Sequence, residues 1–468
     1  MATSRWCWRP TASTSRCSIG AVVSPANPVL TAGEISRLVE ISKPTIAFAV
    51  PTTASKLPSG LPAVLLDSPT FQAWLQLQGG GEHHGDEPAA VVVEQSDTAA
   101  IEYSSGTTAA VKAVALSHGN FIAALALIYE HSRRRPLDLD HERRRVLQAR
   151  PIATSMGFVH MLFTPALGDT LVIMSCAVEE EVRDILGMAE RHRVTDMTVP
   201  PPLVVAMARG EAAGIDVSSL RRLVCGGAAL PVSAEAEFRR RFPGVLLGVG
   251  YGMTEAAGGI STRFDQAKSS RLGSVGHLSP AVQAKIVHQV TGEHLSTNQI
   301  GELHLSGPLV MKGYIGDDKA NSGAFDSDGW LKTGDLCYID QDGFLFIADR
   351  IKDLMNHNGH MVQPAELEQI LHSVPGIADA IVIPFPHEEL GDLPTALVVR
   401  EQDSNNVSEK DIMNYVADQV APYKRIWNVI FVDSIPRPPS GKIMRRELLR
   451  MVKEGHGVNA MGDVDLGK

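Results

Sequence analysis

The chain has 468 residues, more than one hydrophobic core usually serves, so at least two domains are expected. Its 44% hydrophobic and 21% charged residues are ordinary for a globular protein, and its net charge of −10 disfavours nucleic acid as the main partner. No run reaches the ~18 apolar residues of a membrane span, and the 5 scattered cysteines favour a reducing compartment over a disulfide framework.

Residues 1–18 form an atypical N-terminus. Arg5, Arg9 and Arg16 stand among many Ser and Thr residues, and no acidic residue precedes Glu34. This composition is typical of an organelle transit peptide, but we favour a truncated or misassembled N-terminus. The C-terminus is not the S-K-L peroxisomal address, so we expect a cytoplasmic protein.

The first strong helix signal covers Thr31–Ser42, where Thr31 and Glu34 have the spacing of a capping box. Farther along, Ala89–Val93 predicts a short buried strand and Phe121–Tyr129 a helix. Between them lies the hydroxyl-rich stretch Tyr103–Lys112. A polar loop between a strand and a helix can bind phosphate, although a surface turn is the competing interpretation.

The middle of the chain alternates apolar runs with helical patterns. This alternation predicts βαβ units and a parallel sheet. The expected strands and helices, in order, are Leu171–Met174, Glu179–Arg193, Val194–Val199, Ser219–Val224 and Ser233–Phe242.

From Gly273 onward the pattern changes to short strands and turns. Asp326–Trp330 and Asp340–Phe344 are hairpin signals, so Gly301–Ile347 is expected to be mostly antiparallel. A charged break at Asp349–Asp353 precedes a new α+β pattern, which includes helices at Pro364–Leu371 and Arg445–Lys453. The domain boundary is therefore expected near this break.

Several polar motifs follow one another in a fixed order. They are Tyr-Ser-Ser-Gly-Thr-Thr at 103–108, Tyr-Gly-Met-Thr-Glu at 251–255, Leu-Lys-Thr-Gly-Asp-Leu at 331–336, Asp-Arg-Ile-Lys at 349–352 and Pro-Ser-Gly-Lys-Ile at 439–443. Together they resemble the adenylate-forming superfamily of acyl-CoA synthetases, most closely the plant 4-coumarate–CoA ligase-like proteins. The resemblance runs from about Ile19 to about Lys453.

The resemblance implies an α/β fold with two domains. Residues 19–350 would form a truncated N-terminal adenylation domain, made of two α/β subdomains and a β-barrel-like part. Residues 351–468 would form a small, mobile α+β domain on a hinge. The implied partners are ATP, Mg²⁺, CoA and a small carboxylic acid, with 4-coumarate or a related aromatic or fatty acid expected. The acid first forms an acyl-adenylate with release of pyrophosphate, and CoA then displaces AMP. No nucleic acid or membrane span is expected, and no oligomeric state follows.

The resemblance also implies roles for individual residues. Lys442 would be catalytic, because its ammonium bridges the attacking carboxylate and the α-phosphate. Glu255 would hold Mg²⁺, a hard cation that prefers oxygen ligands. ATP-binding residues would be Ser104, Ser105, Gly106, Thr107, Thr108, Lys112, Thr254, Asp335 and Arg350. The acyl-adenylate pocket would include Met156, His160, Gly227, Ala228, Val249, Gly250, Lys352 and Asn356, and CoA would meet Cys176, Asn358 and Gly359.

The sequence departs from the family pattern in the phosphate loop and on the CoA side. Ala109, Val111 and Ala113 stand where Gly, Pro and Gly are usual, with a loss of backbone freedom expected. Asn356 and Asn358 replace two lysines. Two alternatives therefore stay open: a degenerate nucleotide-binding relative without activity, and an adenylating enzyme with weak CoA transfer.

Overall fold

The computed structural model describes residues 20–76, 91–105, 111–133, 144–149, 151–174, 182–263, 271–358, 360–387, 389–401, 407–437 and 443–454. The chain divides into two compact units. The first comprises Met1–Val178, Met253–Gly259 and Gly307–Asp328, and the second comprises Glu179–Gly252, Ile260–Ser306 and Gly329–Lys468. The expected domain boundary between residues 350 and 351 stays a prediction. No helix within the described ranges is long and apolar enough to cross a membrane.

The first unit begins with the expected helix, α1 (Ala32–Ser42). Its capping box is formed: the Glu34 N–H donates to Thr31 Oγ1 over 3.3 Å, and the Thr31 N–H donates to Glu34 Oε2 over 2.7 Å. Each side chain thus satisfies a backbone N–H group at the helix start. The short elements β1 (Ala47–Ala49), α2 (Pro51–Ala54), β2 (Ala63–Leu65) and α3 (Pro69–Gln76) follow, and β1 pairs in parallel with β2.

The hydroxyl-rich stretch joins two strands of one hairpin. β3 (Thr98–Ser105) pairs antiparallel with β4 (Val111–Ser117), and β14 (Gly313–Tyr314) pairs with the other edge of β4. The expected connection from a strand to a helix is therefore wrong. The helix α4 (His118–Arg133) begins only after β4 and contains the predicted segment Phe121–Tyr129.

The strand expected at Ala89–Val93 is also wrong where it is described. Residues 91–93 are not in a strand, and the side chain of Val92 is 85% exposed. An apolar run becomes a buried strand only where a neighbouring strand supplies hydrogen bonds. Here β3, which begins at Thr98, takes one edge of β4, and β14 takes the other. The first unit also contains β5 (Arg145–Gln148), α5 (Ser155–Ala166) and β6 (Thr170–Ile173), in which β5 and β6 run parallel.

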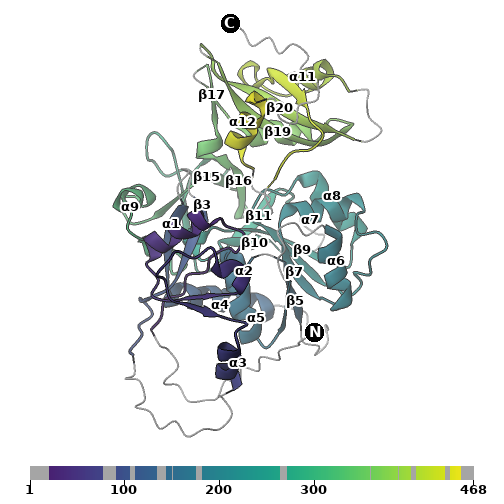
Figure 1. Cartoon of the computed structure of the whole chain (residues 1–468). Coiled ribbons are helices and arrows are strands. Elements are labelled where there is room, and N and C mark those ends of the chain that lie inside the picture. The colour runs from purple at the N-terminus through teal and green to yellow at the C-terminus, as the bar shows by residue number, and fades with distance from the viewer. Residues whose placement is uncertain are drawn as a thin grey trace. The chain divides into compact units, whose positions relative to one another are not determined.

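The second unit contains the predicted parallel strands. β7 (Asp196–Val199), β8 (Arg222–Gly226) and β9 (Leu246–Tyr251) are parallel neighbours. The helices α6 (Val182–Arg191), α7 (Pro201–Arg209) and α8 (Val232–Arg241) lie beside them, and α7 packs against α8 (Figure 1). The βαβ pattern expected from the alternation of apolar runs and helices is confirmed.

Antiparallel strands continue the sheet from β9. In spatial order they are β10 (Ser261–Arg263), β11 (Ser274–Leu278), β16 (Phe344–Arg350), β15 (Leu331–Ile339), β13 (Gly301–Ser306) and β12 (Gln283–Val287). The predicted turn at Asp340–Phe344 joins β15 to β16. The hairpin predicted at Asp326–Trp330 is wrong, because that bend follows the helix α9 (Asp318–Ala324) and leads into β15. Turn-forming residues mark a bend without determining which elements flank it.

The last part of the second unit is a sheet covered on both faces. Its strands are β17 (Met355–His357), β18 (His360–Val362), β19 (Ile377–His387), β20 (Gly391–Arg400) and β21 (Asn428–Phe431), and its helices are α10 (Pro364–Leu371), α11 (Glu409–Ala417) and α12 (Arg445–Lys453). Ala380 and Val382 pack in a cluster with α10 and α11, whereas Ile381 and Ile383 pack with α12. Successive side chains of a strand point to opposite faces, which explains this continuous apolar run.

Candidate functional site

One cluster, in the second unit, converges on Asp335. Its carboxylate is 2% exposed and lies on β15 directly opposite Arg350 on β16. The Tyr251 hydroxyl, at the end of β9, donates to Asp335 Oδ2 over 2.5 Å, and Arg350 Nε lies 3.0 Å from Asp335 Oδ1. These three residues are called the Asp335 cluster below.

The backbone and the electrostatics hold this carboxylate in place. The Asp335 N–H donates to Thr333 Oγ1 over 3.1 Å, and the Thr333 hydroxyl donates to the Leu303 carbonyl over 2.8 Å. Burial, together with the charge of Asp335, raises the pKa of Tyr251 well above its usual value, so the phenol stays a neutral donor. A buried carboxylate that is oriented in this way is a strong acceptor for hydroxyl groups.

A second cluster lies on one face of the sheet formed by β3, β4 and β14 in the first unit. Glu102 lies opposite Val114, which in turn lies opposite Tyr314. Ser104 lies opposite Lys112. Because directly opposed residues share a face and side chains alternate along a strand, all of these side chains lie on the same face of the sheet.

The 3₁₀ turn η1 (Thr254–Ala256) packs against β3 and β4 and carries the predicted metal ligand Glu255. Glu255 is 8% exposed, and its Oε1 accepts a hydrogen bond from the Tyr314 hydroxyl over 3.1 Å. Its backbone carbonyl accepts from the Met311 N–H over 2.9 Å. The Lys112 ammonium lies 4.7 Å from the centre of the Tyr314 ring, an arrangement that stabilises the cation.

Several oxygens of this second cluster lack a hydrogen-bond partner among the described residues. They are both carboxylate oxygens of Glu102 and the hydroxyls of Ser104 and Ser155, and all are buried. Burial raises the pKa of Glu102 from 4.5 to about 7. The Ser155 hydroxyl lies near enough to lower this pKa, without the geometry of a hydrogen bond, and the charge of Glu255 adds to the rise.

This face fits Mg²⁺ and phosphate chemistry. Its donors are oxygens, which a hard cation prefers, and Lys112 supplies a positive charge. No group of three or more His, Cys, Asp or Glu side chains within the described ranges is arranged to hold a metal. Mg²⁺ is commonly bound through one or two carboxylates together with substrate phosphates and water, which matches such a sparse site.

Some predicted site residues lie outside the described residues. These are Gly106, Thr107, Thr108, Cys176, Gly359 and Lys442. Ser105 ends β3, and only its backbone is described, whereas Thr254 begins η1 beside Glu255.

The predicted acyl-pocket residues fall into groups. Gly227 and Ala228 follow the end of β8, next to Val249 and Gly250 on the neighbouring strand β9. Gly227 has φ of 93°, a conformation that favours glycine. Met156 and His160 lie together on the first turns of α5, in the first unit.

The other predicted adenylate and CoA residues that the structure describes follow β16. Lys352 is exposed in the 3₁₀ turn η2 (Ile351–Asp353). Asn356 is the middle residue of β17, and its N–H donates to Asp392 Oδ2 over 3.0 Å. Asn358 occupies the turn between β17 and β18 with φ of 49°, and its N–H donates to the Leu390 carbonyl over 2.7 Å.

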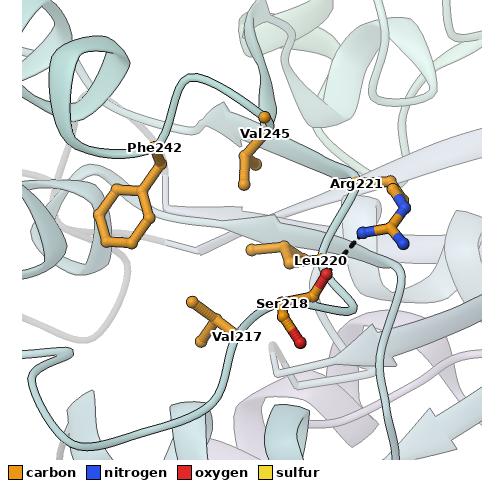
Figure 2. Close-up of a pocket in the computed structure, with 7 residues that line it drawn as sticks. Val217, Ser218, Leu220, Arg221, Phe242 and Val245 are labelled. Carbon is orange, nitrogen blue, oxygen red and sulfur yellow. Dashed lines mark hydrogen bonds between the residues drawn. The ribbon is translucent and has the colours of Figure 1, made fainter.

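A hollow of about 200 Å³ lies at the amino ends of the parallel strands β8 and β9, opposite the end that carries Gly227 (Figure 2). It is lined by Val217, Ser218, Leu220, Arg221, Phe242, Gly244 and Val245. These residues precede β8 and β9, whereas Gly227 follows β8 at its carboxyl end. Ligands of open parallel sheets bind outside the carboxyl ends of the strands, so we do not assign this hollow to the acyl group.

Four polar residues of these clusters were not among the predicted site residues: Tyr251, Tyr314, Glu102 and Ser155. Tyr251 could have been found, because it opens the motif that ends with Glu255. Glu102 offered a weaker signal, a charge inside an apolar strand. Tyr314 offered none, since it is 59 residues from the glutamate it contacts.

Comparison with known proteins identifies the family. The AMP-binding enzyme family matches residues 14–315, and the AMP-binding enzyme C-terminal domain matches residues 366–442. The 4-coumarate–CoA ligase-like 9 protein of Arabidopsis thaliana is 44% identical over 443 residues, which cover 94% of this chain and 77% of that protein.

Solved structures give the same result. The ATP-bound structure of MatB from Rhodopseudomonas palustris superposes with a TM-score of 0.79 at 26% identity, covering 93% of this chain and 84% of that one. O-succinylbenzoate coenzyme A synthetase from Bacillus subtilis, in complex with ATP and a magnesium ion, superposes with a TM-score of 0.73 at 27% identity, covering 91% and 84%. The expected fold class is confirmed. The chain belongs to the AMP-binding enzyme family, and is an AMP-forming acid–CoA ligase of the adenylate-forming superfamily that uses ATP, Mg²⁺ and CoA.

Proposed function

We propose that this ligase activates 4-coumarate or a related aromatic or fatty acid, with the roles of individual residues as follows. Asp335 accepts hydrogen bonds from the ribose hydroxyls of ATP, and Arg350 and Tyr251 orient its carboxylate. The observation that supports this assignment is the buried Asp335 carboxylate, held by the Tyr251 hydroxyl at 2.5 Å and by Arg350 Nε at 3.0 Å.

The phosphates of ATP are assigned to the face of β3, β4 and β14. Ser104 donates its hydroxyl to a phosphate oxygen, and Lys112 offsets negative charge. Glu255 holds Mg²⁺, with Tyr314 fixing the orientation of its carboxylate. Ser105, Gly106, Thr107, Thr108 and Thr254 complete this proposed phosphate site. The motif Tyr251–Glu255 thus contributes one end to each cluster.

Catalysis is assigned to Lys442. Its ammonium neutralises the charge that builds up between the attacking carboxylate and the α-phosphate, so its loss lowers rate more than affinity. Movement at Lys352 then exchanges Lys442 for the residues proposed to meet CoA: Cys176, Asn358 and Gly359.

The acyl pocket is assigned to Met156, His160, Gly227, Ala228, Val249 and Gly250, with Asn356 contacting the adenylate. A pocket with few polar groups suits an aromatic or aliphatic acid. We also propose a cytoplasmic location, because Cys225 and Cys337 are buried and neither forms a disulfide, which fits a reducing compartment.

The alternative of an adenylating enzyme with weak CoA transfer is favoured by Asn356 and Asn358, which stand where the family pattern has lysines. Two assays on the same preparation separate these functions. The first is carboxylate-dependent ATP–pyrophosphate exchange, and the second is CoA thioester formation, both with a panel of cinnamic and fatty acids.

We expect exchange and thioester formation with at least one cinnamic or fatty acid. Exchange without thioester would favour the alternative, and absence of exchange with every acid would leave a non-catalytic nucleotide-binding relative. Lys442→Ala is expected to abolish exchange while ATP still binds. Unchanged exchange in this variant would remove Lys442 from the mechanism.

A further inference from the structure

Glu102 has no function in the assignments above, yet it is the most deeply buried acid of the second cluster. Its side chain is 1% exposed, and neither carboxylate oxygen has a hydrogen-bond partner within the described ranges. An uncompensated buried carboxylate is unfavourable, and such groups in proteins are usually paired or bound to a metal. Glu102 therefore calls for a partner that the described residues do not supply.

The surroundings of Glu102 point to a cation. Ser104 shares its face of β3, and η1 with Glu255 packs against the same strand. The charge of Glu255 raises the pKa of Glu102, so the two acids are electrostatically coupled. The hydroxyls of Ser104 and Ser155 are buried beside them, also without a hydrogen-bond partner among the described residues.

Lys112, the described lysine on this face, is engaged elsewhere. Lys112 shares the face, but its ammonium lies over the Tyr314 ring, and it is not among the charges that shift the pKa of Glu102. The Tyr314 hydroxyl, on β14, donates its hydrogen bond to Glu255. A small, hard cation would satisfy both acids and the hydroxyl oxygens together.

We propose that Glu102 is a second carboxylate ligand, beside Glu255, for the divalent cation of this enzyme. The inference extends the proposed role of Glu255, and it adds a negative charge to the metal site. Cation affinity rises with the number of charged ligands, so the protein is expected to bind a divalent cation before ATP arrives.

The test measures Mn²⁺ binding without nucleotide at pH 8. The electron paramagnetic resonance signal of the free ion gives the fraction of Mn²⁺ that is not bound. Glu102→Gln is expected to weaken Mn²⁺ binding about tenfold, and Glu255→Gln at least as much. Glu94→Gln changes an exposed carboxylate just ahead of β3 and serves as the matched control, with wild-type affinity expected. Thermal unfolding of each variant confirms that it is folded.

Equal Mn²⁺ affinity in wild type and folded Glu102→Gln would overturn the proposal, as would a wild type that binds no Mn²⁺. A loss of equal size in Glu94→Gln would also overturn it, because the effect would then follow overall charge. The measurement needs neither ATP nor an acid. A further outcome is that ATP–pyrophosphate exchange fails with every acid while Glu102→Gln still weakens Mn²⁺ binding. That result would reject the proposed catalytic function and support Glu102 as a metal ligand.

Discussion

The Asp335 cluster and the face of β3, β4 and β14 each contain a buried carboxylate, but they differ in whether that carboxylate has hydrogen-bond partners. In the Asp335 cluster, a carboxylate 2% exposed is bonded to a tyrosine and an arginine of the same unit. On the sheet face, Glu102 is buried to a similar degree, and its carboxylate oxygens have no hydrogen-bond partner among the described residues.

The difference indicates what each cluster is built to bind. A carboxylate already oriented by its neighbours presents fixed acceptors to a neutral ligand such as a ribose, with little reorganisation. A buried carboxylate without partners gains most from a cation, because the positive charge of the cation offsets the cost of burying the negative charge. We propose that the first cluster is preorganised, whereas the second is completed by its ligand.

The largest effect is expected from removing the centre of the preorganised cluster. Asp335→Asn deletes the charge that Tyr251 and Arg350 orient, and it weakens the hydrogen bonds proposed for the ribose. ATP affinity, measured by calorimetry, should fall about a hundredfold. Asp342→Asn, on the exposed turn between β15 and β16, should bind ATP normally. An Asp335→Asn variant with wild-type ATP affinity would mean that the ribose lies elsewhere.

The next effect is a pH dependence of stability that belongs to Glu102. Its folded pKa of about 7 lies above the unfolded value of 4.5, so the folded state binds the proton more tightly. The resulting stability is complete below pH 4.5 and is lost as pH rises through 7, by about 3 kcal/mol in total. Glu102→Gln lacks this titration.

Urea unfolding at pH 5 and pH 8, with EDTA present, measures the difference. Wild type should lose more stability than Glu102→Gln between the two pH values, since the other groups titrate equally in both proteins. Parallel pH profiles would show that Glu102 is solvated or already paired. If Mn²⁺ raises the free energy of unfolding of the wild type at pH 8, the stability lost by ionising Glu102 is recovered by the cation, as the proposed metal site requires.

A smaller effect is expected from Tyr314→Phe. The change removes the donor to Glu255 and keeps the ring beneath Lys112, so it costs about one hydrogen bond, or about 1 kcal/mol. Mn²⁺ affinity should fall about fivefold. Tyr415→Phe, far along the chain on α11, provides the control. A Tyr314→Phe variant that binds Mn²⁺ as wild type does would show that Glu255 needs no orienting donor.

The smallest effect concerns the phosphate loop. Ala113 was expected to restrict a loop that needs glycine, but it lies within β4, is 2% exposed and does not have a positive φ. Ala113→Gly should therefore lower the free energy of unfolding by about 1 kcal/mol and leave ATP affinity unchanged. Tighter ATP binding in this variant would restore the original interpretation.

Local patterns were enough to predict several elements. The capping box of α1 needs only Thr31 and Glu34, three residues apart, and the limits of α10 and α12 match the predicted helices. The polar motifs were enough to predict the family, because their order and spacing are properties of the chain alone. Such features depend only on residues close together in the chain, so they can be predicted from the sequence.

Tertiary structure decided which side chains meet. Tyr251 is 84 residues from Asp335, and Tyr314 is 59 residues from Glu255, so both contacts depend on the pairing of distant strands. It also decided that the hydroxyl-rich stretch joins two strands, because β4 supplies the hydrogen bonds of β3. The burial of Glu102 follows from the same register. A one-residue slip would turn its carboxylate to the other face, which is why no local pattern revealed it.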